Sequence, residues 1–124
     1  MKLWYSNSSP YARKARAVVQ YHQLQDHVEL LLTTSGLDKN SPHNLDNPLG
    51  RLPALQRENG EWLYNSSLIA EYLDNIGTQP SLYGNKETRW EILRLHYLAD
   101  GILENEISVA PEKCLRPQEQ WWLE

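Results

Sequence analysis

Two short stretches, residues 50–55 (GRLPAL) and 65–67 (NSS), carry residue types suited to binding a small ligand. Pro53 precedes a short apolar run, and a proline, which has no N–H, is tolerated at the start of a strand. The bond before a proline is also the place where a cis peptide costs little. A cis bond between Leu52 and Pro53 would turn the N–H and C=O of Leu52 away from the sheet. We therefore expect Leu52 to offer both groups to a peptide-like ligand.

The second stretch is expected to open a helix. The first N–H groups of a helix have no partner within it, so they bind carboxylates well. Together with Leu52, they would form the two halves of a site for a small acidic peptide. The alternative, an ordinary turn before a strand and no ligand, stays open on these residues alone.

Composition excludes several classes of function. A net charge of −4 disfavours a nucleic-acid binder, which normally shows a basic face. Cys114 is the only cysteine, so internal disulfides, CxxC redox chemistry and cysteine-based zinc sites are excluded. None of the four histidines stands at metal-ligand spacing, and we expect no metal. No membrane-spanning run or signal peptide is visible, so we expect a cytoplasmic protein.

The first part of the chain is typical of a strand–helix–strand unit. Residues 2–5 have strand composition, and Ser9 followed by Pro10 is a typical helix start, with Ser9 as the N-cap. Apolar residues then recur along one helix face to position 22. Residues 28–32 form an apolar run of strand length, which we expect to be covered on both faces.

The next part predicts a hairpin and a second helix. We expect an irregular segment at 33–47 with one short helical turn, followed by two short strands that flank an Asn59–Gly60 turn. An amphipathic helix then begins at Ser66 and is closed by Gly77. The fold class is therefore α/β, with a βαβ-ββα domain at 1–77 and a linker at 78–86.

Residues 87–124 are expected to begin an all-helical domain. Nine of the fourteen residues at 90–103 are apolar and cover most of a helix circumference, so this helix needs more partners than the chain supplies. Another helix is expected to start at Pro117, and only eight residues, 117–124, are left for it. We interpret the chain as truncated within a second domain; coverage of the helix by a homodimer or another chain is the alternative.

Four motifs carry a family resemblance. SSPYARKAR, NPLGRLPAL, NSSLIAEYLD and LADGILENEI resemble the cytosolic glutathione S-transferases, in particular their bacterial serine-type branch. The resemblance covers residues 1–124. It implies a thioredoxin-like domain that binds glutathione, with the electrophile held mainly by the helical domain, and a homodimer when the chain is full length.

The resemblance also implies a catalytic residue. Ser9 stands where the family has its catalytic serine, whose hydroxyl donates a hydrogen bond to the glutathione sulfur. A nearby donor and a helix N-terminus both stabilise a thiolate. A role as N-cap alone is the simpler interpretation of Ser9, and Ser8 is a close rival because a shift of one residue would exchange them.

Five further residues match substrate-binding positions of the family. Leu52 precedes the expected cis Pro53, and its main chain would pair with the cysteinyl backbone of glutathione. Ser66 would hold the γ-glutamyl carboxylate, although it is also an N-cap candidate. Asn65 stands where an acidic residue is usual and would lose an ion pair to the γ-glutamyl ammonium. Arg51 lies next to the expected glycyl end, unless it is simply an exposed loop arginine.

Two classes of function follow. The first is a glutathione transferase, which adds the glutathione thiolate to a small electrophile, with glutathione as co-substrate and no prosthetic group, nucleic acid or membrane partner. The alternative is a non-catalytic binding or regulatory module with the same fold. A glutaredoxin-type oxidoreductase is excluded because Ser8 and Ser9 stand where it needs a cysteine.

Overall fold

A computed structural model describes residues 1–34 and 38–121, without the side chains of 112 and 113. The chain divides into two compact units, Met1–Leu82 and Tyr83–Glu124, and each is described by itself. Our division into 1–77, 78–86 and 87–124 stays a proposal.

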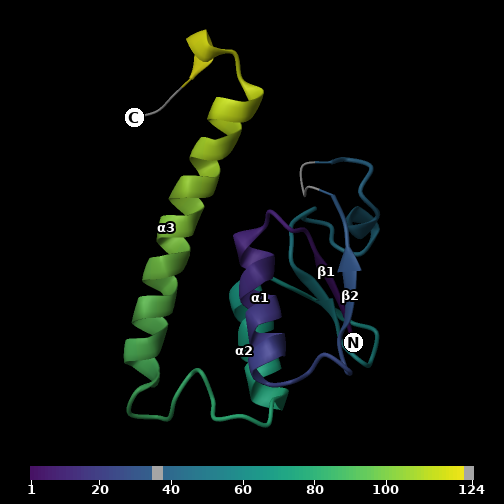
Figure 1. Cartoon of the computed structure of the whole chain (residues 1–124). Coiled ribbons are helices and arrows are strands. Elements are labelled where there is room, and N and C mark those ends of the chain that lie inside the picture. Colours follow the sequence, from purple (N-terminus) through teal and green to yellow (C-terminus); the bar gives the residue numbers. More distant parts are fainter. Residues whose placement is uncertain (35–37, 122–124) are drawn as a thin grey trace. The chain divides into compact units, whose positions relative to one another are not determined.

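The first unit is built on a four-stranded mixed sheet (Figure 1). Its strands lie in the order β2-β1-β3-β4, with β1 parallel to β2, and with β3 antiparallel to both β1 and β4. They span Lys2–Tyr5 (β1), Glu29–Leu32 (β2), Ala54–Gln56 (β3) and Trp62–Tyr64 (β4). The predicted βαβ-ββα order and thioredoxin-like fold are confirmed.

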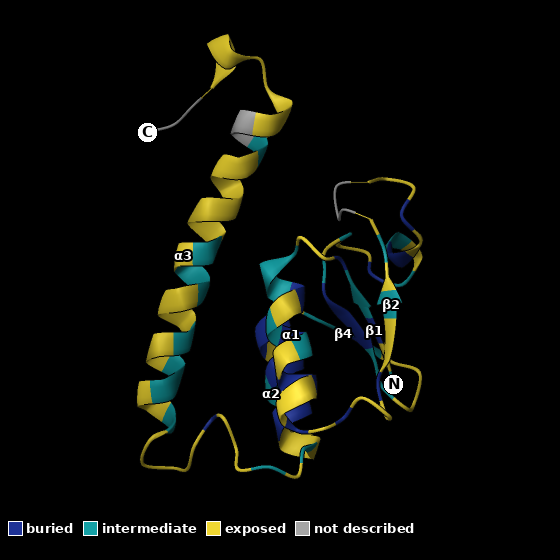
Figure 2. Ribbon diagram, viewed as in Figure 1, coloured by how far each residue is buried: buried dark blue, intermediate teal, exposed yellow. Residues whose placement is uncertain are grey.

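Two helices pack against each other and against the sheet. They are α1 (Pro10–Tyr21) and α2 (Ser66–Ile76), and Figure 2 shows their buried residues in dark blue. The core between them consists of apolar side chains from both helices and from β1 and β3: Leu3, Ala15, Val18, Val19, Leu55, Ile69, Ala70 and Leu73. In its described residues, the irregular segment contains one 3₁₀ turn, η1 (Pro42–Leu45), as expected.

The expectation that residues 28–32 are covered on both faces was wrong. Strand β2 lies at the edge of the sheet, and Leu30 and Leu32 are 43% and 57% exposed. An apolar run of this length is typical of a buried central strand, but it does not fix the position of a strand in its sheet. Only Val28, just before the strand, is buried.

A buried His–Asp pair ties the end of α2 to the segment after it. Asp74 accepts hydrogen bonds from His22 Nε2 (2.8 Å), Ser81 Oγ (2.5 Å) and the Leu82 N–H (2.8 Å). The Gln79 N–H donates to His22 Nδ1 at 3.2 Å, so the ring proton lies on Nε2. A Cβ on Gly77 would clash with the His22 ring at Nδ1, and this contact explains the glycine at the predicted C-cap.

The second unit contains one long helix, α3 (Arg89–Leu115), which continues through Pro111. Its apolar residues include strongly exposed ones, with Trp90 at 77% and Tyr97 at 59%. Pro117 precedes only a 3₁₀ turn, η2 (Gln118–Gln120), and residues 122–124 of the expected helix lie outside the described part. In the part of the chain that the structure describes, no helix has the length and hydropathy that a membrane crossing requires.

Candidate functional site

The strand register brings the predicted site segments to one edge of the sheet, the one formed by the end of β1, the start of β3 and the end of β4. Trp4 of β1 pairs with Ala54, the first residue of β3, and Ala54 pairs with Tyr64, the last residue of β4. The turn after β1, the turn before β3 and the start of α2 therefore all lie at this edge. Residues separated by more than 50 positions in the sequence are brought together in this way.

Ser9 caps helix α1 as predicted. Its Oγ accepts a hydrogen bond from the Ala12 N–H at 3.1 Å. This bond uses a lone pair of the hydroxyl oxygen and leaves the O–H proton to donate elsewhere. The cap role and a role as donor to a ligand sulfur are therefore compatible, and the half-buried side chain stands at the positive end of the helix dipole.

Ser8, the rival of Ser9, has a different environment. It is exposed, and its Oγ lies 3.4 Å from the Oγ of buried Ser6. It also lines a hollow of about 490 Å³ together with Leu32 and Thr33. Ser8 lies before the helix and makes no cap, so the N-terminal dipole of α1 favours Ser9 as the donor.

The turn before β3 has the expected backbone. The Leu52–Pro53 bond is cis, and Pro53 is buried. The Leu52 N–H has no hydrogen-bond partner among the described residues, so it is available to a ligand. The side chain of Arg51 is exposed, which is compatible both with a ligand contact and with a simple loop arginine.

The start of α2 separates the roles of Asn65 and Ser66. Asn65 has a φ of 74° and a ψ of 123°, an uncommon backbone conformation for a residue other than glycine. Its Oδ1 accepts from the Ser67 and Leu68 N–H groups (2.8 and 3.4 Å). Asn65 is thus the N-cap, and the competing interpretation of Ser66 as the cap was wrong. The Ser66 side chain is buried, yet its hydroxyl has no partner in the part of the chain that is described.

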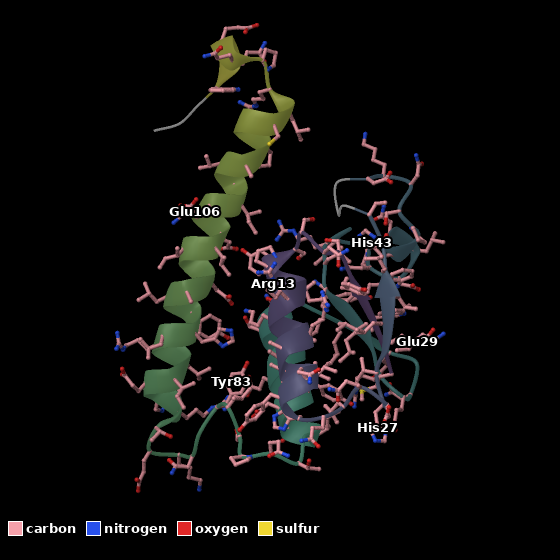
Figure 3. All side chains as sticks on the ribbon, in the orientation of Figure 1. Arg13, His27, Glu29, His43, Tyr83 and Glu106 are labelled. Carbon is pink, nitrogen blue, oxygen red and sulfur yellow. The ribbon has the colours of Figure 1, made fainter. Side chains whose placement is uncertain are left out.

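The structure adds residues that the sequence analysis did not single out for the site. Lys14 Nζ donates to Ser67 Oγ at 3.1 Å, which places a cation beside the start of α2. Figure 3 labels Arg13 on the same helix; this side chain is exposed. The proximity of Lys14 to α2 depends on tertiary packing and had no signal in the sequence.

The titratable groups do not resemble a metal centre. Over residues 1–34 and 38–121, no cluster of three or more His, Cys, Asp or Glu side chains is arranged to hold a metal ion. Cys114, the residue that a redox role would need, lies exposed near the end of α3. The groups at the sheet edge are hydroxyls, amides and backbone N–H groups, which suit an anionic, peptide-like ligand.

Comparison with known proteins shows the family of the chain. The family model "Glutathione S-transferase, N-terminal domain" matches residues 8–76. A glutathione transferase family member from Pseudomonas fluorescens Pf-5, solved with bound glutathione, is 35% identical with a TM-score of 0.88. The match covers 98% of this chain and 60% of that one.

Two further relatives extend the comparison. A glutathione S-transferase from Methylobacillus flagellatus KT, with glutathione bound, is 34% identical over 98% of this chain and 59% of its own, with a TM-score of 0.88. The uncharacterized GST-like protein YibF of Escherichia coli K12 is 30% identical over 84% of this chain and 50% of its own.

These findings define a thioredoxin-like domain of the glutathione-transferase type. The chain belongs to the glutathione S-transferase family, because the N-terminal domain model matches more than half of it. It spans about half to three fifths of the length of these relatives.

Proposed function

We propose that this chain supplies the glutathione site of a glutathione transferase, which adds the thiolate of glutathione to a small electrophile. The observation that carries the proposal is the convergence of three segments at one sheet edge, set by the pairs Trp4–Ala54 and Ala54–Tyr64. Each segment offers an available group: the Ser9 hydroxyl proton, the Leu52 N–H and the Ser66 hydroxyl.

The proposed chemistry follows from the ligand's own groups. Leu52 would pair with the cysteinyl carbonyl, and Pro53 would keep the turn in place. Ser66 would bind the γ-glutamyl carboxylate through its hydroxyl and its own N–H, because the Ser67 and Leu68 N–H groups already donate to Asn65 Oδ1. The ligand thiol would then lie near Ser9. Lowering a thiol pKa from about 8.5 to near 7 requires about 2 kcal/mol, which one hydrogen bond to an anion and a helix dipole can supply.

The pH titration of bound glutathione tests this function without an electrophile. The ultraviolet absorbance of the thiolate is followed against pH for glutathione alone and for glutathione saturated with the chain. We expect the bound thiol to ionise at least one pH unit below the free thiol. Conjugation to an activated aryl halide, measured at neutral pH, then tests whether the thiolate reacts.

A non-catalytic module is the second candidate, and Asn65 favours it. Its Oδ1 is engaged in capping α2, so it is not a free acceptor for the γ-glutamyl ammonium. In that case the chain would bind glutathione, or another acidic peptide, without lowering the thiol pKa. An unchanged thiol titration in the saturated complex would select this alternative over the enzyme.

Three further features are part of the proposal. The partners are glutathione and a small electrophile, the full-length protein is a homodimer, and the compartment is the cytoplasm. Arg51 would contact the glycyl carboxylate. The single exposed cysteine, Cys114, has no part in the chemistry.

A further inference from the structure

The peptide group between Arg51 and Leu52 is held from the side opposite its free N–H. Asn47 Nδ2 donates a 2.7 Å hydrogen bond to Arg51 O. This peptide is trans, because Leu52–Pro53 is the cis bond in the described chain, and the C=O and N–H of a trans peptide point in opposite directions. With the Arg51 carbonyl fixed toward Asn47, the Leu52 N–H must point away from Asn47.

Asn47 is itself fixed on several sides. The residue is 1% exposed, and its Oδ1 accepts a hydrogen bond from the Leu49 N–H at 2.9 Å. Its backbone N–H donates to His43 O, and its carbonyl accepts from the Gly50 N–H, both at 2.9 Å. The amide therefore has one orientation, with Oδ1 toward Leu49 and Nδ2 toward Arg51.

The preceding peptide group is held by a buried histidine. His43, labelled in Figure 3 in the loop after β2, is 0% exposed, and its Nε2 lies 3.1 Å from Gly50 O. A carbonyl only accepts, so Nε2 carries the proton and Nδ1 accepts from Ser41 Oγ at 2.6 Å. Thr33 Oγ1 contacts the Ser41 hydroxyl in turn, and the Thr33 N–H donates to Tyr5 O.

This chain of hydrogen bonds connects the end of β1 with the carbonyl of Gly50. Hydrogen bonds in such a series polarise one another when they lie away from water. Two consecutive carbonyls, those of Gly50 and Arg51, are thus fixed by two buried side chains. The peptide that follows is the one whose N–H remains free.

We propose that Asn47 and His43 are positioning residues of the glutathione site. Asn47 directs the Leu52 N–H toward the cysteinyl carbonyl of glutathione, and His43 fixes the peptide before it. The inference rests on the proposed function. Neither residue contacts the ligand; both act through the backbone at positions 50–52.

The experiment is an NMR titration of the ¹⁵N-labelled 124-residue chain with glutathione. The variant Asn47→Asp keeps the size and the Oδ1 acceptor but replaces the Nδ2 donor with an oxygen. We expect about tenfold weaker binding. We also expect the Leu52 amide resonance to lose its response to glutathione while the Ser66 amide, at the other end of the ligand, keeps it. General loss of structure would affect both amides.

A matched control lies in the same loop. Asn44 Nδ2 donates to the carbonyls of Asp38 and Lys39, which are outside the site, so Asn44→Asp removes comparable bonds. We expect this variant to bind as the wild type does. If Asn47→Asp does not fold, His43→Gln and His43→Leu replace it: glutamine keeps an N–H donor within reach of Gly50 O, whereas leucine does not.

The outcomes separate the two proposals. If the wild type responds at Leu52 and Ser66, and Asn47→Asp or His43→Leu responds in the same way with unchanged affinity, the positioning role is overturned and the glutathione site stands. If the folded wild type does not respond at all, the proposed function fails and the positioning role fails with it. If Asn47→Asp or His43→Leu loses the response of the Leu52 amide alone, and His43→Gln resembles the wild type, the result supports both the glutathione site and the positioning role.

Discussion

At the scale of single residues, the proposed site depends on which atoms remain available after the fold has used the others. The Ser9 hydroxyl accepts the Ala12 N–H and keeps its proton, whereas Asn65 uses its Oδ1 in the cap of α2. The two N-cap residues at this sheet edge therefore differ in the hydrogen-bonding groups that they can still offer to a ligand. Ser9 can still donate to an anion, and Asn65 can no longer serve as a free acceptor.

Ser9→Ala tests the role of this remaining proton. The substitution removes the proposed donor to the sulfur. We therefore expect the pKa of the thiol of bound glutathione to rise and the turnover to fall strongly, while glutathione binding stays nearly intact. The loss of the cap should also cost about 1 kcal/mol of stability. Steady-state conjugation kinetics measure the turnover, and the ultraviolet absorbance of the thiolate against pH measures the pKa of the bound thiol.

Ser8→Ala is the control for the turn. Ser8 does not cap α1, so its loss should leave stability and turnover close to the wild type. A large loss of turnover in Ser8→Ala and none in Ser9→Ala would assign the donor to Ser8 instead.

At the scale of elements, the His22–Asp74 pair fixes how the chain leaves α2. Burial acts to raise the pKa of Asp74, but the hydrogen bonds from Ser81, the Leu82 N–H and His22 outweigh it and hold the pKa below its ordinary value. The carboxylate therefore favours the folded state. Because the folded pKa is the lower one, this stabilisation is complete above the ordinary aspartate pKa of about 4 and is lost as the pH falls through the folded value.

Asp74→Asn should lower the free energy of unfolding at neutral pH by about 1–3 kcal/mol, because it disrupts a buried charge-assisted network. The difference from the wild type should shrink as the pH falls below about 4. Urea unfolding at several pH values measures both effects. Asp26→Asn, on an exposed aspartate, is the control. A difference that stays constant down to pH 3 would contradict the assigned role of the carboxylate.

Most elements could be predicted because their signals are local. The Ser9–Pro10 helix start, the Asn59–Gly60 turn and the cis bond before Pro53 each depend on neighbouring residues, and the structure has all three. The edge position of β2 could not be predicted, because strand order depends on pairing between distant segments.

The same distinction applies to the candidate site. Ser9, Leu52 and Ser66 were found through their motifs, and their roles toward a ligand stay predictions. The support given by His43 and Asn47 was not visible, since it depends on tertiary packing that places side chains of one loop against carbonyls several residues away. Periodicity and turn chemistry carry no information of that kind.

At the scale of the whole molecule, helix α3 carries more apolar surface than its own unit covers. Trp90, Tyr97 and Leu98 are 77%, 59% and 57% exposed. Apolar surface of this kind is typical of a face that another segment or chain covers. The relatives that this chain resembles are considerably longer, since the chain spans about half to three fifths of their length.

We therefore expect the 124-residue chain to self-associate. Light scattering over a tenfold range of concentration should show an apparent mass that rises with concentration. Leu98→Lys should reduce the association without lowering the stability of the first unit, because Leu98 belongs to the second. A monodisperse monomer at every concentration would show that α3 needs no further cover.

The measurement that tests the central claim most directly is a calorimetric titration of this chain with glutathione at neutral pH. Saturable binding with a Kd at or below the millimolar range is the expected result, and it should weaken when Ser66 is replaced by alanine. No heat from a sample that circular dichroism shows to be folded would contradict the account, because the groups offered by Leu52 and Ser66 would then not form a working site.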